Sequence, residues 1–157
     1  MNALRIGDPA PDFTIDTTTD ATLHALIKER QTAAVVYFYP LDFSPVCSAQ
    51  ACMIRGIQKG TDGGLSPLII GVSPQSDRVH SKFRDSKNLP QLLVSDRNKA
   101  IATSYGAVGL LGMIRRVSYL INPNLRIAGR AFGTLSLAQH QKLVSDYVGS
   151  LSDPPDA

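Results

Sequence analysis

The stretch AAVVYFY, residues 33–39, decides the fold, because every position is apolar or aromatic and several side chains are β-branched. A strand with one face in water alternates polar and apolar residues, and this stretch does not. We therefore predict a central β-strand that is covered on both faces. A second stretch of this kind, LIIGV at 68–72, predicts a neighbouring buried strand.

Helices are predicted between and around the strands. Pro45 suits the first turn of a helix that runs to about Gln58, since its missing N–H costs nothing there. Ser76 can cap the helix that follows the second strand. The alternation of buried strands with helices predicts an α/β fold, a central mixed β-sheet flanked by helices on both sides. Further strands are expected at 92–94, 117–121 and 126–132, and further helices at 21–30, 98–105 and 136–151.

Length and composition predict one soluble domain. The 157 residues suit a single domain at 1–151 followed by a polar, proline-containing tail at 152–157. The net charge is +3, but the cations are scattered rather than clustered, so we expect no nucleic-acid partner. The longest apolar run, 33–39, is far shorter than the ~20 residues that span a bilayer. We expect no membrane partner, no signal peptide and a cytoplasmic location.

The two cysteines, Cys47 and Cys52, are the candidate reactive groups. In reducing compartments a cysteine pair is more often catalytic or metal-binding than structural. Cys47 follows the central strand and a proline-initiated turn, so we expect it in a helix's first turn, where free N–H groups lower the thiol pKa. A thiolate there is a nucleophile. At this point a buried cysteine that packs as a small hydrophobe is an equally good interpretation.

The residues before Cys47 carry a resemblance to a known family. The segment PLDFSPVC, residues 40–47, resembles the peroxiredoxin pattern of Pro, three residues, Thr or Ser, two residues and the peroxidatic Cys. In that family the proline shields the cysteine from water, the hydroxyl contacts the peroxide, and a distant arginine holds the thiolate and peroxide oxygens. The resemblance therefore implies catalytic roles for Pro40, Ser44 and Cys47.

The resemblance covers nearly the whole chain, from GDPAPDF at 7–13 to RVSYLINP at 116–123, and implies a thioredoxin-like fold. It also implies a catalytic arginine in the second of these segments. Arg115 and Arg116 are adjacent in a predicted strand, so their side chains face opposite ways and only one can reach the site. Alternation does not choose between them, and the family register selects Arg116.

The segment CSAQAC, residues 47–52, narrows the resemblance to the bacterioferritin comigratory protein or PrxQ subfamily. That subfamily implies a Cys47 sulfenic acid resolved by Cys52 as an intramolecular disulfide and recycled by thioredoxin or a similar dithiol. Its substrates would be hydrogen peroxide and organic hydroperoxides, and its state a monomer or weak dimer. Asp42 and Val46 depart from the subfamily pattern, and an extra carboxylate opposes thiolate formation.

Two other functions compete with the peroxidase. A thioredoxin-like disulfide reductase usually needs Cys-x-x-Cys, which is absent. A non-catalytic redox-sensing module has less need for groups that stabilise a peroxide leaving oxygen. The glycine-rich segment 106–112 lacks the strand-glycine-helix order of a nucleotide site and is predicted to be a loop. The histidines are isolated and the cysteine spacing does not fit zinc, so we expect no cofactor and no metal.

Overall fold

A computed structural model describes residues 3–16, 18–40, 68–87, 92–132 and 142–143 of the chain. Several predictions fall outside these residues. They are the helix after Pro45, most of the helix at 136–151, the tail, and the side chains of Ser44, Cys47 and Cys52.

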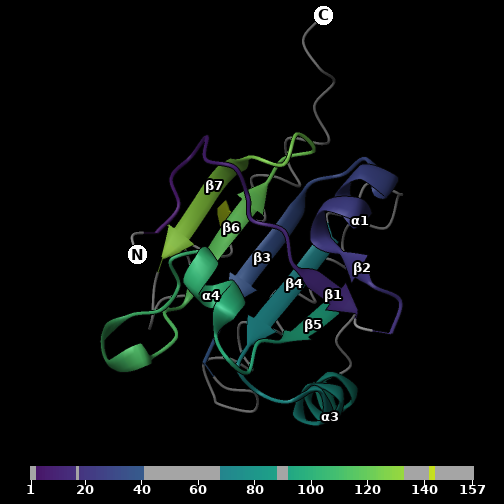
Figure 1. Cartoon of the computed structure of the whole chain (residues 1–157), viewed down its shortest axis with the longest axis vertical. Coiled ribbons are helices and arrows are strands. Elements are labelled where there is room, and N and C mark those ends of the chain that lie inside the picture. Colours follow the sequence, from purple (N-terminus) through teal and green to yellow (C-terminus); the bar gives the residue numbers. More distant parts are fainter. Residues whose placement is uncertain (1–2, 17, 41–67, 88–91, 133–141, 144–157) are drawn as a thin grey trace, which may run out of the picture.

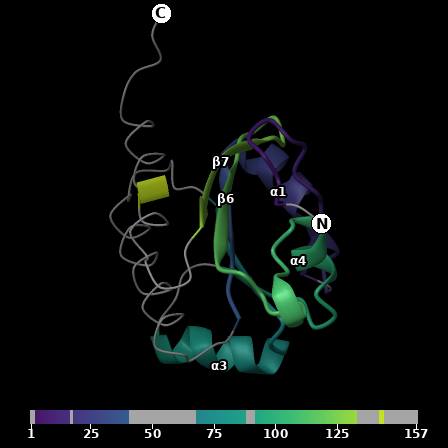
Figure 2. The same ribbon diagram turned by 90° about the vertical axis from the view of Figure 1, so that its left-hand side faces the viewer.

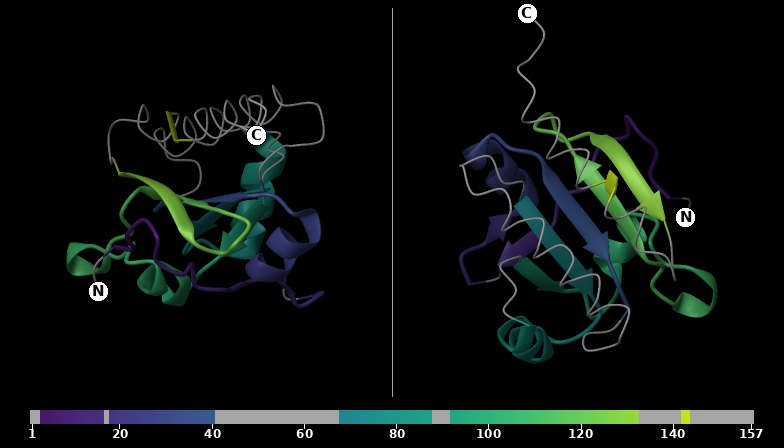
Figure 3. Two further views of the ribbon diagram at one scale, coloured as in Figure 1. Left: turned by 90° about the horizontal axis from the view of Figure 1, so that it is seen from above. Right: turned by 180° about the vertical axis from the view of Figure 1, so that it is seen from behind.

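The core of the fold is a five-stranded mixed sheet in the order β5-β4-β3-β6-β7 (Figure 1). β3 is parallel to β4, and β4 is parallel to β5. β6 is antiparallel to both β3 and β7. Figure 3 shows the same arrangement from above and from behind. The predicted mixed sheet is confirmed, with strands β3 at Ala34–Phe38, β4 at Leu68–Ser73, β5 at Leu92–Ser95, β6 at Val117–Ile121 and β7 at Ile127–Phe132.

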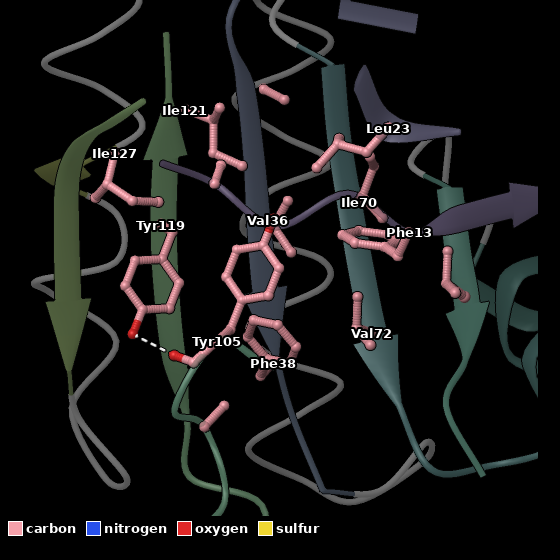
Figure 4. Close-up of a cluster of buried hydrophobic side chains, with 14 of the residues drawn as sticks. Phe13, Leu23, Val36, Phe38, Ile70, Val72, Tyr105, Tyr119, Ile121 and Ile127 are labelled. Atoms are coloured by element: carbon pink, nitrogen blue, oxygen red, sulfur yellow. Dashed lines mark hydrogen bonds between the residues drawn. The ribbon is translucent and has the colours of Figure 1, made fainter. Parts of the chain in front are cut away.

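β3 is buried along its whole length, as its sequence predicts. Its alternate residues Ala34, Val36 and Phe38 belong to one apolar cluster, which also includes Ile70 and Tyr119 of the neighbouring strands (Figure 4). The other alternate residues therefore point to the opposite face of the sheet. The sheet therefore lies between the main core on one side and the candidate site on the other.

A short hairpin precedes the first helix. β1, Thr14–Asp16, pairs antiparallel with β2, Ala21–Thr22, and α1, Leu23–Arg30, follows at once. The helix predicted from residue 21 thus begins two residues later, because Thr22 is extended and its hydroxyl accepts a hydrogen bond from the Ala25 N–H at 3.3 Å. Strands this short leave no periodic signal in a sequence.

The other described helices lie at two places around the sheet. α3, Asp77–Lys87, begins after Ser76, whose hydroxyl accepts from the Val79 N–H as predicted. α4, Ala100–Ser104, is shorter than the predicted 98–105, and Gly106 ends that segment with a positive φ of 67°. α1 and α4 lie on one side of the sheet, and α3 lies at its lower end (Figure 2). None of the helices in the described ranges is long and apolar enough to cross a membrane.

The N-terminal segment runs extended along the far end of the sheet. Ala10 N–H donates to the Leu125 carbonyl at 2.9 Å, and Ile127 N–H donates to the Asp8 carbonyl at 2.9 Å. The prolines of the GDPAPDF segment favour this extended conformation, because they fix φ and lack an N–H. The first residues described are therefore bonded to the last strand pair.

Candidate functional site

The site begins where β3 ends. Tyr39 N–H donates to the Val72 carbonyl at 3.2 Å, and the Ser73 hydroxyl donates to the Pro40 carbonyl at 3.5 Å. β3 and β4 therefore stop at the same edge of the sheet, and Pro40 is half-buried there. The carboxyl ends of parallel strands are the usual place for reactive groups in open α/β sheets.

Arg116 reaches this edge from the neighbouring strand. The antiparallel register pairs Phe38 with Val117, so one further step sets Arg116 opposite Tyr39. The side chain of Arg116 is only 5% exposed. Val117 and Tyr119 belong to the main core, so alternation sends Arg116 to the other face, together with Tyr39.

Arg115 differs from its neighbour in burial. It is exposed, and its side-chain stem lies against Gly109, where a β-carbon would come within 2.9 Å of the arginine Cγ. The sequence left the choice between the two arginines to the family register. Their burial now distinguishes them, because only Arg116 turns into the protein beside the end of β3.

His80 supports this edge from α3. The ring is 1% exposed; its Nε2 lies 3.1 Å from the Val94 carbonyl and its Nδ1 lies 3.5 Å from the Tyr39 hydroxyl. A carbonyl only accepts, so in the neutral ring Nε2 carries the proton and Nδ1 accepts from Tyr39. The histidine thus links α3 and β5 to the residue before Pro40. In the sequence His80 has no other histidine or cysteine near it, but His80 and Phe83 are the two buried residues of α3 and are spaced i, i+3.

Tyr39 and Asp96 make further contacts at the same edge. The Tyr39 ring stacks on Tyr37, with centroids 5.5 Å apart. At the ends of β4 and β5, Asp96 N–H donates to the Ser73 carbonyl at 2.8 Å, and the Asp96 carboxylate accepts from two amides in the first turn of α4. The carboxylate caps that helix, so α4 is fixed to the edge of the sheet. The surroundings of Pro40 are therefore well ordered by backbone and side-chain bonds.

The comparison with known proteins decides the family. Residues 6–130 match the model of the AhpC/TSA family. The chain is a peroxiredoxin of this family. It is 30% identical over 158 aligned positions to a protein of Haemophilus influenzae named putative peroxiredoxin bcp, covering 96% of this chain and 100% of that one. It is 35% identical over 102 positions to peroxiredoxin Bcp of Bacillus subtilis, covering 65% and 64% of the two chains.

Solved structures support the same peroxiredoxin fold. Peroxidoxin BcpB of Mycobacterium tuberculosis superposes with a TM-score of 0.80 at 22% identity, over 96% of this chain and 99% of that one. The bacterioferritin comigratory protein of Xanthomonas campestris gives a TM-score of 0.73 at 22% identity, over 85% and 86%. The thioredoxin-like fold and the peroxiredoxin interpretation of the sequence are confirmed, and the protein is a thiol peroxidase.

Of the five residues given catalytic roles by the resemblance, two lie in the described part of this peroxiredoxin. Pro40 follows β3 and Arg116 precedes β6, so both lie at the same end of this adjacent strand pair. Ser44, Cys47 and Cys52 belong to the segment outside the described residues. Among the described residues, no group of three or more His, Cys, Asp or Glu side chains is placed to hold a metal ion.

Two buried tyrosines lie on the core side of the sheet, away from this edge. The Tyr119 hydroxyl donates to the Tyr105 carbonyl at 2.8 Å, and the Tyr105 hydroxyl donates to the Pro11 carbonyl at 2.6 Å (Figure 4). Burial raises the pKa of Tyr105 far above its usual range and also raises the pKa of Tyr119. Both stay neutral at physiological pH and anchor the N-terminal segment.

Proposed function

We propose that this peroxiredoxin reduces hydrogen peroxide and organic hydroperoxides by nucleophilic attack of the Cys47 thiolate. The sulfur bonds to one peroxide oxygen, the O–O bond breaks, and the other oxygen leaves as water or an alcohol after taking a proton. Cys47 becomes a sulfenic acid. The observation that carries this proposal is the burial of Arg116 beside the end of β3, which lies nine residues before Cys47 in the sequence.

A buried guanidinium suits this reaction. Arginine keeps its charge at all physiological pH values, and its planar fork donates several hydrogen bonds in fixed directions. Such a fixed cation favours the thiolate and stabilises the negative charge that develops on the leaving oxygen. Pro40 would shield the sulfur from water, and Ser44 would supply a hydroxyl to the peroxide.

Cys52 would resolve the oxidised enzyme. Its thiolate attacks the sulfenic sulfur, an intramolecular disulfide forms, and water leaves. A dithiol protein such as thioredoxin then reduces the disulfide by exchange, being oxidised in turn. This cycle needs a reducing compartment, which supports a cytoplasmic location.

Disulfide formation would require local unwinding of the segment that carries both cysteines. If residues 46–58 form the helix that the sequence predicts, five positions separate Cys47 and Cys52 by roughly 7.5 Å of rise and about 140° of rotation. Their α-carbons would then be about 8 to 9 Å apart, whereas disulfides rarely exceed about 7 Å. The opening is plausible near a helix start, where few intrahelical bonds are lost.

The substrate range follows from the chemistry and from one relative. Attack on an O–O bond is the same type of step whether the second oxygen leaves as water or as an alcohol. The Xanthomonas campestris bacterioferritin comigratory protein is described by its alkyl peroxide reduction activity. This supports organic hydroperoxides as substrates beside hydrogen peroxide.

The proposal is tested by peroxide-dependent NADPH oxidation coupled through thioredoxin and thioredoxin reductase. Wild-type protein should turn over, and Cys47→Ser should abolish turnover while leaving the fold intact. Cys52→Ser should form a trappable sulfenic acid at Cys47 and lose thioredoxin-supported turnover. Retained turnover in Cys47→Ser would refute the peroxidase assignment of that residue. Peptide mass mapping after peroxide treatment distinguishes the expected Cys47–Cys52 disulfide from an intermolecular one.

A further inference from the structure

The loop between α4 and β6 carries an apolar tip, formed by Leu110, Leu111 and Met113. These side chains are 92%, 97% and 65% exposed. Among the described residues, only Ile6 is a further large hydrophobic side chain with comparable exposure. The loop projects beyond the sheet, in green at the lower left of Figure 1. Single exposed hydrophobic residues are common in proteins, but three on one projecting loop indicate a binding function.

The tip is an ordered structure. A bridge between Val108 and Ile114 closes the loop, and Gly109 N–H donates to the Met113 carbonyl at 2.7 Å. Met113 N–H in turn donates to the Leu110 carbonyl at 3.3 Å. Leu111 has φ 59° and ψ 22°, a left-handed conformation that is unfavourable for a non-glycine residue. The loop thus holds one exposed leucine, Leu111, in a strained conformation, which is a pattern associated with function.

Cations flank this tip, and carboxylates are missing from the surrounding sequence. The Lys99 Nζ donates to the Gly112 carbonyl at 2.5 Å, and the stem of Arg115 lies against Gly109. From residue 97 to residue 145 the sequence has seven Lys and Arg residues and no Asp or Glu. Two cations therefore lie at the foot of the apolar tip, and the acidic residue nearest to it in the chain, Asp96, already accepts hydrogen bonds from the Ile101 and Ala102 amides.

We propose that the apolar tip inserts into the interfacial layer of a lipid bilayer that contains anionic lipids, with Lys99 and Arg115 at the level of the head groups. Apolar side chains beside a basic collar bind such surfaces through buried area and electrostatic attraction together. The internal hydrogen bonds of the loop reduce the cost of removing its backbone from water. The sequence argument against a membrane partner concerned spanning segments, which a surface contact does not need.

A second copy of this chain is the main competitor for the tip. A hollow of about 290 Å³ lined by Thr103, Gly106, Val108 and Gly109 lies beside it and has room for an apolar side chain. However, a two-fold contact uses the same patch on both copies, so it would bring two sets of these cations together without a carboxylate from residues 97–145. Three side chains are also few compared with the roughly 20–30 residues per partner in a stable interface. An anionic bilayer fits the charge and needs no matching surface.

Flotation of the full-length protein with large unilamellar vesicles tests the proposal. Wild-type protein should float with vesicles of equal parts phosphatidylcholine and phosphatidylglycerol, less so as salt increases, and not with phosphatidylcholine alone. The double variant Leu110→Ser/Leu111→Ser should reduce partitioning by about tenfold or more. Arg115→Gln should reduce it by about fivefold.

Matched controls separate this effect from unfolding. Ile6→Ser removes the other exposed apolar side chain, which is 66% exposed, and should leave partitioning unchanged. The double variant should keep wild-type turnover of hydrogen peroxide without vesicles. Wild-type protein that stays off anionic vesicles, or a double variant that binds them equally well, overturns the proposal. So does a lipid-free wild-type dimer, seen by light scattering, that the double variant converts to a monomer.

Discussion

The loop residues before Ile114 and the residues after it that lead into β6 differ in an unusual way: an apolar side chain is exposed in the first region and a charged side chain is buried in the second. Arg116 is 5% exposed although it is charged, and Leu111 is 97% exposed although it is apolar. In most proteins charged side chains lie outside and large apolar ones lie inside. Most of the described chain follows that rule, with β3 and β4 buried along their whole length. Asp96, which is 3% exposed, and Ile6, which is 66% exposed, are further departures. Such departures single out residues to test for a role in function rather than folding.

The largest effect should come from the buried side of this comparison. Arg116→Met should lower the second-order rate constant for hydrogen peroxide by roughly 10²- to 10³-fold, because it would remove the fixed charge that we propose lies at the reacting oxygens. Arg115→Met, at the exposed neighbour, should change it by only a few-fold. Stopped-flow kinetics measures both. Equal losses in the two variants would show that burial does not identify the catalytic arginine.

A glycine tests how tightly the site face is packed. A β-carbon at Gly71 would lie 2.6 Å from the Tyr37 ring tip and 2.9 Å from the Leu93 side chain. Gly71→Ala should therefore destabilise the protein by about 1–3 kcal/mol in urea unfolding. Tyr37→Leu in the same background should recover part of the loss, detected as coupling in a double-mutant cycle. Additive losses would mean that the clash lies elsewhere.

Buried hydroxyls on the core face should produce a pH effect. The folded-state pKa of Tyr105 is raised by burial above the unfolded value of about 10. Its contribution to stability is therefore complete below about pH 10 and decreases as the pH rises above that value. Tyr105→Phe should lose about 1 kcal/mol at neutral pH with its bond to Pro11. Above pH 10 the free energy of unfolding should decrease less steeply with pH in this variant than in wild type. Urea titrations at several pH values measure this, and the same pH dependence in both proteins would contradict the assignment.

The smallest effect should come from the exposed side. Leu111→Gly should raise the free energy of unfolding by a few tenths to about 1 kcal/mol, because glycine adopts the left-handed conformation without strain. Leu110→Gly is the matched control, since Leu110 does not have a positive φ. It should leave stability unchanged or lower it. A gain in the control as large as in the Leu111 variant would argue against stored strain.

The sequence predicted the centre of the sheet well because β3 and β4 are almost continuous apolar runs, which can be recognised without knowing their partners. It missed β1 and β2, which have three and two residues and no period. It did not find the role of His80, because the contact with Tyr39 joins residues 41 positions apart. It identified the segment 106–112 as a loop. It did not predict that Leu110 and Leu111 are exposed, because their exposure depends on the direction in which the loop projects from the rest of the protein.

For the candidate site, the sequence indicated the reaction but not which of the two arginines reaches the site. The spacing of Pro40, Ser44 and Cys47 pointed to the reaction, since the residue types themselves define it. The choice between Arg115 and Arg116 depends on register, which alternation alone does not specify. Burial in the folded chain supplies that missing information for the arginine.

The pairing of β3 with β6 has a consequence for synthesis of the chain. β3 is hydrogen-bonded on one side to β4, which is the next strand in the sequence. On the other side it is hydrogen-bonded to β6, which is translated much later. Until residues 117–121 leave the ribosome, one edge of the most apolar strand lacks its partner, and the N-terminal segment lacks residues 125–127. An unpaired apolar edge is prone to aggregation during this interval. Nascent chains truncated before residue 117 should therefore depend on chaperones far more than the released protein does.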